Sequence, residues 1–328
     1  MDNRVAVAVI GVGYMGRLHI QKYATMKDVE IVAICDLNIE KGQELACELA
    51  CLFFQSYKEL PLSELHAVSI ASDTPTHADI GKFFLENGID VLIEKPIASS
   101  IEEAMDLVNS AKANSCILQV GHLERFNPVF IKLKSCLNSP RYFEIKRITP
   151  YRGRGADVDV VLDLMIHDID LLLDLVGEEV VKVDAIGIPV LTSSIDVAQV
   201  RIEFDSGVVA NVSASRVATG SERTMRIFQP DEYISVDLLK KHFKRFKKIE
   251  KPGVHLPIEI EEQSFDQSDP LYDQLLSFIG AVRTRTGVVV SGLEAVHAIR
   301  VVQKIKDSIQ TSLDKFSANK LESKRAVG

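Results

Sequence analysis

The sequence has no apolar run that could cross a bilayer and few features of a secreted chain. No stretch approaches the roughly 18 to 20 apolar residues that a membrane-spanning helix needs. Residues 1–4 lead straight into a strand-like segment and lack the basic and then apolar layout of a signal peptide. The five cysteines are an odd number, and none of them forms a Cys-x-x-Cys pair. These absences favour a chain that works in the reducing cytoplasm.

The sequence also has fewer basic than acidic residues. Lys and Arg total 38 against 46 Asp and Glu, which gives a formal net charge of −8. A general nucleic-acid binder needs an excess of positive charge facing the phosphates, so we expect no nucleic-acid partner. The 328 residues are more than twice the roughly 150 usually given to one domain, which predicts two domains.

Residues 1–121 alternate between strand and helix patterns. Apolar strand patterns cover residues 5–10, 30–35, 67–71, 90–93 and 117–120. Helical patterns fill the intervals at 16–26, 39–50, 76–87 and 101–114. Strands that are separated by helices pair in parallel through crossover connections. We therefore predict that residues 1–121 form an α/β domain with a doubly wound parallel sheet.

The alternation of strand and helix patterns ends near Gly121, and residues 122–328 are expected to form a second, α+β domain. Helical patterns at 128–137 and 158–176 accompany strand patterns at 142–147, 180–187, 196–204, 208–217 and 224–228. Consecutive strands without intervening helices favour an open, mostly antiparallel sheet. From residue 269 the pattern returns to helices, of which we expect two.

A glycine-rich turn follows the first expected strand and opens the first expected helix. It reads Gly11-Val12-Gly13-Tyr14-Met15-Gly16, the G-x-G-x-x-G pattern of dinucleotide-binding Rossmann domains. Its glycines permit a tight turn, a close approach of the backbone to a pyrophosphate and close packing of helix against strand. The helix N-terminus then supplies N–H groups and a partial positive charge for the phosphates.

Asp36 ends the second expected strand, about 20 residues beyond the last glycine of the turn. A carboxylate there accepts hydrogen bonds from the adenosine ribose hydroxyls and repels a 2′-phosphate. The two residues that follow bring no cation to offset that repulsion, so we expect the cofactor NAD rather than NADP. The backbone of three further residues is expected to line the adenosine side: Ser72, Thr74 and Pro75.

Glu94-Lys95-Pro96 ends the fourth expected strand, at the edge where doubly wound sheets place their ligands. Glu94 and Lys95 are therefore candidates for contact with the cofactor, and Lys95 also for contact with the substrate. A surface lysine at a strand end is the alternative interpretation. Pro96 would permit a cis peptide bond.

Asp163, His167, Asp170 and Asp174 are spaced by four, three and four residues, which places them on one face of a helix. The rest of that helix is apolar, and a buried polar stripe costs free energy unless its groups are paired or used. In one interpretation Asp163 orients the His167 ring, and His167 exchanges a proton with the substrate. The alternatives are a satisfied histidine beside a solvated acidic face and a metal site. No second His or Cys cluster supports the metal site, so we expect no metal.

Two further polar segments admit two interpretations each. Arg125 and Asn127 are candidates to bind a phosphate or a sugar hydroxyl of the substrate, or they belong to the capped start of a helix at Pro128. Residues 240–248 carry six Lys or Arg in nine positions. Such a run is typical of a solvated strand or loop, and the alternative is attraction of an anionic substrate such as a nucleotide sugar.

The glycine turn, Glu94-Lys95-Pro96 and Asp163-x-x-x-His167, in this order, resemble the glucose–fructose oxidoreductase, inositol dehydrogenase and rhizopine-catabolism (Gfo/Idh/MocA) family. The resemblance covers nearly the whole chain. It implies Lys95 and His167 as catalytic residues accompanied by Asp163, and a nicotinamide cofactor bound by the first domain. It also implies a sugar or cyclitol substrate against the open sheet of the second domain, and a homodimer or homotetramer formed through that sheet.

Residues 120–128 and 157–170 resemble family members that oxidise C3 of UDP-N-acetylglucosamine. In that reaction a secondary carbinol carbon gives a hydride to nicotinamide C4 and its hydroxyl proton to a base, for which we favour His167. Lys95 would stabilise the charge on the same oxygen, although the two roles are exchangeable on sequence grounds. The alternatives are an inositol or simple hexose dehydrogenase and a non-catalytic NAD(P)-binding sensor, which would not need Lys95, Asp163 and His167 together.

Overall fold

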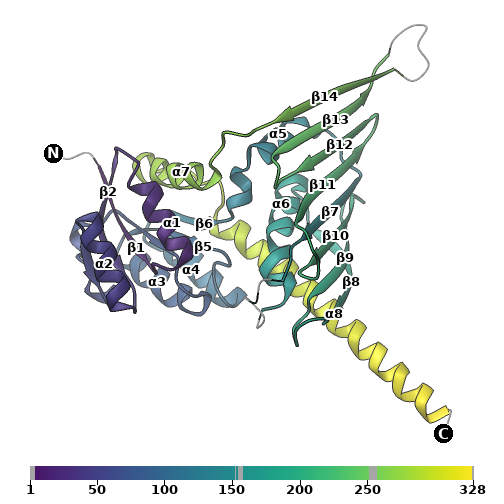
Figure 1. Ribbon diagram of the computed structural model, residues 1–328, viewed down its shortest axis with the longest axis horizontal. Helices are drawn as coiled ribbons and strands as arrows, with labels where there is room; N and C mark the ends of the chain where they lie inside the picture. The colour runs from purple at the N-terminus through teal and green to yellow at the C-terminus, as the bar shows by residue number, and fades with distance from the viewer. Residues whose placement is uncertain (1–3, 152, 154–157, 251–256, 327–328) are drawn as a thin grey trace. The chain divides into compact units, whose positions relative to one another are not determined.

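The computed structural model describes residues 4–151, 153, 158–250 and 257–326, and the chain divides into two compact units (Figure 1). The first unit comprises Met1–Phe126 and Asp269–Ile299, and the second comprises Asn127–Ser268 and Arg300–Gly328. Residues 269–299 therefore join the first unit, whereas the sequence groups them with the second domain. In the described part of the chain, no helix is both long enough and apolar enough to cross a membrane.

The first unit is built on a six-stranded sheet whose strands pair in parallel. Its order, β3-β2-β1-β4-β5-β6, is that of a doubly wound dinucleotide-binding domain. The strands are β1 (Val5–Ile10), β2 (Val29–Cys35), β3 (Leu52–Phe54), β4 (Ala67–Ile70), β5 (Asp90–Glu94) and β6 (Leu118–Gly121). The predicted parallel sheet is confirmed. β3 was not predicted, because three residues at a sheet edge are too few to show a pattern.

Helices connect these strands, and short-range contacts explain where two of them begin. They are α1 (Tyr14–Tyr23), α2 (Ile39–Leu49), α3 (His77–Glu86) and α4 (Ile101–Ala113), with 3₁₀ turns at Tyr57–Glu59, Leu62–Glu64, Thr74–Thr76 and Leu123–Phe126. The Asn38 side chain accepts the N–H of Lys41 at the start of α2. Ser100 and Glu103 form a reciprocal capping box at the start of α4.

Helix α7 (Pro270–Thr284) completes the first unit although it lies far along the chain. Its residues Leu275 and Phe278 are buried in one apolar cluster with Val7 of β1. A helical pattern identifies an apolar face but not the partner of that face, so the sequence could not assign α7 to this unit. Helix α8 (Gly292–Ala326) begins in the first unit and continues in the second.

The second unit is built on an eight-stranded sheet with the order β14-β13-β12-β11-β7-β10-β9-β8. Neighbouring strands are antiparallel except β7 and β10, which are parallel. The strands are β7 (Tyr142–Ile148), β8 (Val180–Ile188), β9 (Val197–Phe204), β10 (Val209–Ser215), β11 (Glu222–Gln229), β12 (Glu232–Asp237), β13 (His242–Lys248) and β14 (Ile258–Ser264). The predicted open, mostly antiparallel sheet is confirmed.

The sequence shows no strand pattern for β12 and β14, and it left the basic run that contains β13 as a solvated strand or loop. β13 is strongly basic and β14 exposes most of its residues, so neither shows the clear alternation of a half-buried strand. A turn signal was nevertheless present. Asp231, between β11 and β12, has a φ of 59°, a conformation that Asp and Asn adopt more readily than most residues.

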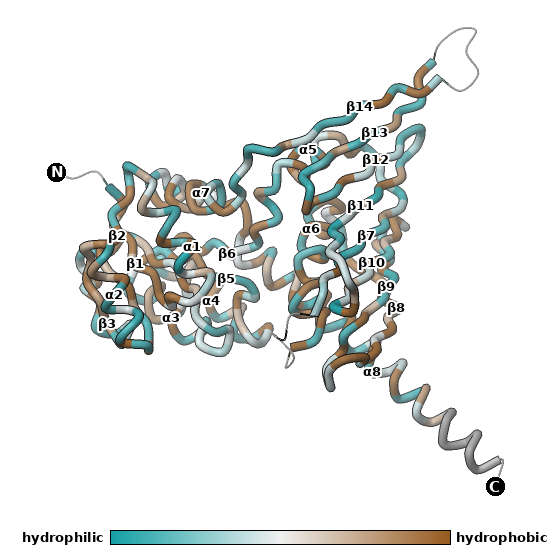
Figure 2. Tube along the Cα trace, in the orientation of Figure 1, coloured by the Kyte–Doolittle hydropathy of each residue, from teal (hydrophilic) through white to brown (hydrophobic). Residues whose placement is uncertain are grey.

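Helices cover one face of the second sheet. Helix α5 (Pro128–Cys136) packs on β12 and β13, and α6 (Ile166–Val176) is joined to β7 by an ion pair described below. Along β9, β10 and β11, buried residues alternate with more exposed ones, and hydrophobic and hydrophilic positions alternate along the strands in Figure 2. A π-helical turn, Val161–Met165, precedes α6, where the sequence predicts one unbroken helix over 158–176. A 3.6-residue pattern does not reveal such a turn because its period is longer.

Candidate active site

The glycine-rich turn between β1 and α1 leaves space that side chains would fill. Gly11 has a φ of 85°, and a Cβ there would lie 2.7 Å from the backbone nitrogen of Ser72. A Cβ at Gly16 would lie 1.8 Å from the carbonyl oxygen of Gly11, so glycine lets α1 pack against the turn. A Cβ at Gly13, the N-cap of α1, would meet nothing within 4 Å. The first N–H groups of α1 therefore border open space, which fits a pyrophosphate.

A cavity of about 540 Å³ adjoins this turn at the carboxyl ends of β1, β2 and β4. Of the predicted cofactor residues, its lining contains Gly11, Gly13, Asp36, Ser72 and Pro75. Gln55 and Tyr57, which follow β3, also line it. No motif in the sequence marks these two residues, because their place depends on a strand too short to be predicted.

The backbone holds the Asp36 carboxylate in this cavity. Its Oδ2 accepts the N–H of Val12 at 2.7 Å, and its Oδ1 accepts the N–H of Asn38 at 2.8 Å. Each oxygen keeps a lone pair for a ribose hydroxyl. The charged residues in the described lining are Asp36, Asp73 and Asp79, with no Lys or Arg among them. This negative lining disfavours a 2′-phosphate and suits NAD.

Cys35 also lies in the cavity wall. Burial raises the pKa of its thiol to about 12, and the negative charges of Asp36 and Glu59 add to the shift. The thiol therefore stays protonated at neutral pH, and Cys35 serves as a small apolar side chain rather than as a nucleophile.

The remaining residues predicted for the glycine turn and its surroundings lie outside the cavity lining. Val12 is buried, Met15 is partly buried, and Tyr14 is 75% exposed. Gly16 packs inside α1, and Thr74 begins the 3₁₀ turn that precedes α3. Their predicted contacts with the cofactor stay predictions.

Glu94 and Lys95 lie at the carboxyl end of β5, and the Lys95–Pro96 peptide bond is cis. His77 is buried at the start of α3. Its Nδ1 lies 2.9 Å from the carbonyl oxygen of Pro96, and its Nε2 lies 3.0 Å from that of Ser72. The ring therefore joins the backbone that follows β4 to the backbone that follows β5.

Arg125 and Asn127 are both buried. Arg125 Nη1 lies 3.1 Å from a carboxylate oxygen of Glu294. The Asn127 side chain accepts the N–H of Val129 as the N-cap of α5 and donates to the carbonyl oxygen of Leu238 at 3.0 Å. The expected capped helix start is present, and a role of either residue in substrate binding stays a prediction.

In the second unit, Asp163 and His167 are both half-buried, on the π-helical turn and on the first turn of α6. Short π turns are frequent at functional sites. Of the other two acids in the predicted stripe, Asp170 is buried and Asp174 is paired with Lys134 at 2.8 Å. Among the described residues, no group of three or more His, Cys, Asp or Glu side chains could hold a metal ion.

Asp168, which the sequence did not single out, anchors the helix that carries His167. Its two carboxylate oxygens accept hydrogen bonds from Nε and Nη2 of Arg147 at 2.8 and 2.9 Å. Both side chains are almost fully buried, so the bidentate pair is strong and fixes α6 against β7. No sequence signal identifies the pair, because its partners are 21 residues apart on different elements.

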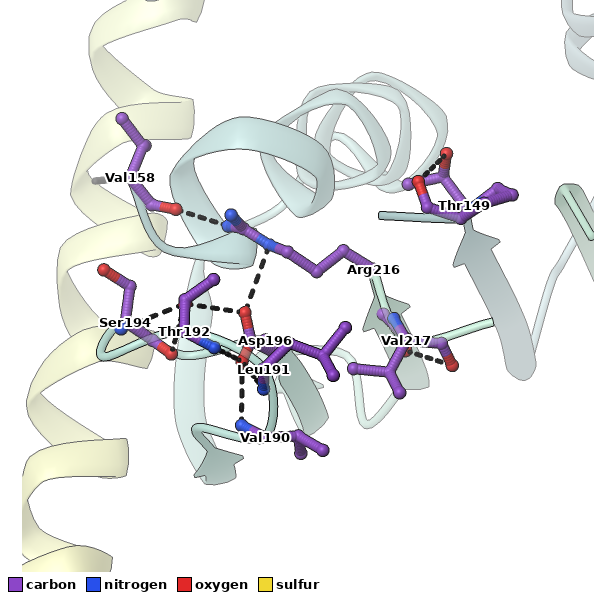
Figure 3. A network of polar contacts seen from close by, with 11 residues as sticks. Thr149, Val158, Val190, Leu191, Thr192, Ser194, Asp196, Arg216 and Val217 are labelled. Carbon is purple, nitrogen blue, oxygen red and sulfur yellow. Dashed lines mark hydrogen bonds and ion pairs between the residues drawn. The ribbon is translucent and has the colours of Figure 1, made fainter. Parts of the chain in front are cut away.

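A second buried ion pair holds the chain just before the π-helical turn (Figure 3). Arg216 Nε lies 3.6 Å from Asp196 Oδ1, and Arg216 also donates to the carbonyl oxygen of Val158. Asp196 Oδ2 accepts three backbone N–H groups at 2.6 to 2.8 Å, those of Val190, Leu191 and Thr192. Burial alone would raise the pKa of Asp196, but these hydrogen bonds outweigh it and hold the pKa at about 2.

Residues 242–248 of the basic run form β13, and most cations of the run pair with nearby carboxylates. Arg245 pairs with Glu232 on β12 and with Glu261 on β14, and Lys244 pairs with Glu262 on β14. Lys240, Lys247 and Lys248 have carboxylate partners as well. The pairing favours the interpretation of this run as a strand of a charged sheet surface.

The parallel sheet, the glycine turn and the acidic cavity define the class of this protein, a dinucleotide-binding Rossmann domain that suits NAD, joined to an α+β unit. Comparison with family models gives the same result. Residues 5–122 match an oxidoreductase family with an NAD-binding Rossmann fold, and residues 138–231 match the GFO/IDH/MocA C-terminal domain. The chain belongs to the Gfo/Idh/MocA family, which confirms the resemblance seen in the sequence. It is an NAD-dependent oxidoreductase.

Similarity to one relative extends over nearly the full length of both chains. UDP-N-acetylglucosamine 3-dehydrogenase of Acidithiobacillus ferrooxidans is 34% identical over 94% of this chain and 98% of that protein. A solved structure of that enzyme has a TM-score of 0.87 to this chain, with the same coverage. The scyllo-inositol 2-dehydrogenase (NAD(+)) of Bacillus subtilis is 29% identical over 66% of this chain and 69% of that protein.

Proposed function

We propose that this chain oxidises a secondary hydroxyl of a nucleotide sugar with NAD, at C3 of UDP-N-acetylglucosamine, and forms the 3-keto sugar. The observation that carries the proposal is the near full-length similarity to an enzyme of that name. That similarity includes the second unit, with Asp163 and His167, whereas the similarity to the inositol dehydrogenase covers about two thirds of each chain.

The first unit is suited to hold NAD through the glycine turn and Asp36. Asp36 would accept hydrogen bonds from the adenosine ribose, and the N–H groups at the start of α1 would face the pyrophosphate. When bound, NAD supplies the acceptor for the hydride that leaves the carbinol carbon.

Three side chains would move or hold the substrate's proton and charge. His167 would take the hydroxyl proton, because imidazole titrates near neutral pH. Asp163, one turn earlier, would orient the His167 ring. Lys95 would donate a hydrogen bond to the carbinol oxygen and stabilise its developing negative charge, a contribution of about 3 kcal/mol for a single donor.

An inositol or simple hexose dehydrogenase is the second candidate, and the charge pairing favours it. Arg125 is paired with Glu294, and the cations of β13 are paired with carboxylates of β12 and β14. A diphosphate would have to compete with these carboxylates for the cations. A substrate without a diphosphate would not need these cations, so it could bind while the ion pairs stay intact.

We also propose that the chain forms a homodimer or homotetramer through the open face of the second sheet. On this face a row of aromatic rings crosses β7, β11, β12 and β13, with neighbouring centroids 5.6, 5.1 and 5.6 Å apart: Tyr142, Phe228, Tyr233 and Phe246. Ile260 of β14 continues the row and is 57% exposed. Such an apolar row on an exposed sheet is typical of an interface.

All five cysteines are free thiols, which fits the cytoplasm we expect.

The proposed reaction is tested by NADH fluorescence during incubation with NAD and a panel of four sugars. The panel holds UDP-N-acetylglucosamine, UDP-glucose, myo-inositol and glucose, and a glutamate-dependent aminotransferase is added to consume a 3-keto product. Signal with UDP-N-acetylglucosamine alone is the expected result. Signal with myo-inositol or glucose alone would replace the nucleotide sugar by the second candidate. Silence across the panel, with NAD binding intact, would refute UDP-N-acetylglucosamine as the substrate and point to a substrate outside the panel or to a sensor.

A further inference from the structure

A buried histidine that the proposed reaction does not use contacts Glu94 at the end of β5. His19 of α1 is fully buried, and its Nε2 lies 3.1 Å from Glu94 Oε1. Its Nδ1 lies 2.7 Å from the hydroxyl of Ser69 on β4. One ring thus joins three elements of the first unit.

The chemistry of the partners fixes the direction of the contact with Glu94. An ionised carboxylate can only accept, so Nε2 of His19 carries a proton and donates it in a hydrogen bond to Glu94. The Ser69 hydroxyl can both donate and accept. It donates to Nδ1 when the ring is neutral and accepts from Nδ1 when the ring is charged. The bond from His19 to Glu94 is therefore made in either state of the ring.

Gly121 of β6 confines the same carboxylate from another side. In the sheet, Gly121 is the direct partner of Glu94. A Cβ at Gly121 would lie 2.7 Å from Glu94 Oε1 and 3.1 Å from Oε2, so only glycine leaves room for the carboxylate there. The Glu94 side chain is 12% exposed. It is thus nearly enclosed, yet it ends at the edge of the sheet where ligands bind.

The strand order indicates which half of NAD lies near Glu94. The order reverses between β1 and β4, and a dinucleotide lies across that point. Asp36 and the cavity lie at the ends of β2, β1 and β4, which assigns the adenosine to that side. Glu94 is three strand spacings from Asp36, about 14 Å, on the side left for the nicotinamide riboside. The nicotinamide riboside carries carboxamide N–H and ribose O–H groups, from which a carboxylate can accept hydrogen bonds.

We propose that His19 is a positioning residue for the nicotinamide half of the cofactor site. It acts through Glu94. Its hydrogen bond keeps the Glu94 carboxylate beside Gly121, where the carboxylate can accept a hydrogen bond from the nicotinamide riboside. The inference rests on NAD as the cofactor and not on the identity of the sugar.

The test compares the binding of NAD with that of ADP, which keeps the adenosine and both phosphates but lacks the nicotinamide riboside. In isothermal titration calorimetry, His19→Leu is expected to raise the Kd for NAD about tenfold, the effect of one hydrogen bond to a charged group. The Kd for ADP is expected to stay within about twofold. His19→Gln keeps an N–H donor near the position of Nε2 and is expected to recover most of the NAD affinity.

Two further variants keep the test decisive if His19→Leu does not fold. Glu94→Gln is expected to weaken NAD and spare ADP in the same way, because a neutral amide oxygen accepts more weakly than a carboxylate. Asp36→Ala is the matched control on the adenosine side, and it should weaken both ligands. Equal losses of NAD and ADP in His19→Leu, or unchanged NAD binding in Glu94→Gln, would overturn the proposal. Since neither ligand is a sugar, these outcomes are independent of the substrate panel.

Discussion

The buried pair of Asp196 and Arg216 leads to a quantitative prediction for the stability of the second unit. The folded pKa of Asp196 is about 2 against an ordinary value of 3.8. At about 1.36 kcal/mol per pKa unit, the ionised carboxylate contributes about 2 kcal/mol to folding. Because the folded pKa is the lower one, this stability is fully present above about pH 4 and is lost as the pH falls through about 2.

Asp196→Asn should remove this contribution at neutral pH. The neutral amide oxygen accepts the three backbone N–H groups more weakly than the carboxylate does, and the NH₂ group that replaces Oδ1 faces the Thr192 hydroxyl and the Arg216 guanidinium. Arg216 is 4% exposed and loses its charged partner, so the expected destabilisation is about 2 to 4 kcal/mol. Asp184→Asn is the matched control, because Asp184 forms an exposed pair with Lys182 and its loss should have no measurable effect.

Hydrogen exchange measured by mass spectrometry, together with urea unfolding, tests this prediction. The peptide over residues 189–196 should lose protection in Asp196→Asn, since its amides donate to that carboxylate. The stability difference between wild type and variant should shrink by more than half between pH 5 and about pH 2.5. Equal protection in both proteins, or a difference that does not change with pH, would refute the linkage to the Asp196 charge.

Four further predictions concern the cofactor, the reaction and the basic run. Asp36→Ala should raise the Kd for NAD by about ten- to a hundredfold, from the loss of hydrogen bonds to a charged acceptor, and should weaken NADP far less; calorimetry showing equal losses would contradict the ribose contact. His167→Ala should lower kcat by about a hundredfold or more with NAD affinity unchanged, and full turnover in this variant would exclude it as the base. Lys95→Ala should lower kcat by about a hundred- to a thousandfold if it stabilises the oxygen, as steady-state rates would show. Lys244→Ala with Lys247→Ala should leave KM for UDP-N-acetylglucosamine within about twofold at low salt, since both cations are paired; a large rise that disappears with added salt would restore the attraction hypothesis.

Short-range patterns were sufficient to predict most of the first unit. The apolar run of β1, the glycine turn and Asp36 lie close together in the sequence. The order of strand, turn, helix and strand there indicates a parallel sheet with crossover connections. The capped start of α5 at Asn127 is local in the same sense. Strand β14 was not predicted and β13 was left as a strand or loop, because their charged residues pair with residues of neighbouring strands and hide the alternation of a half-buried strand.

The sequence by itself therefore determined the class of fold, the family and the positions of Lys95, Asp163 and His167 along the chain. Only the tertiary structure decided that α7 belongs to the first unit, that Asp168 and Asp196 are buried with arginine partners, and that His19 holds Glu94. The physical reason is the same in each case. A helix or a turn is specified by neighbours in the chain, whereas the partner of a buried charge or of an apolar face is chosen by packing between distant segments.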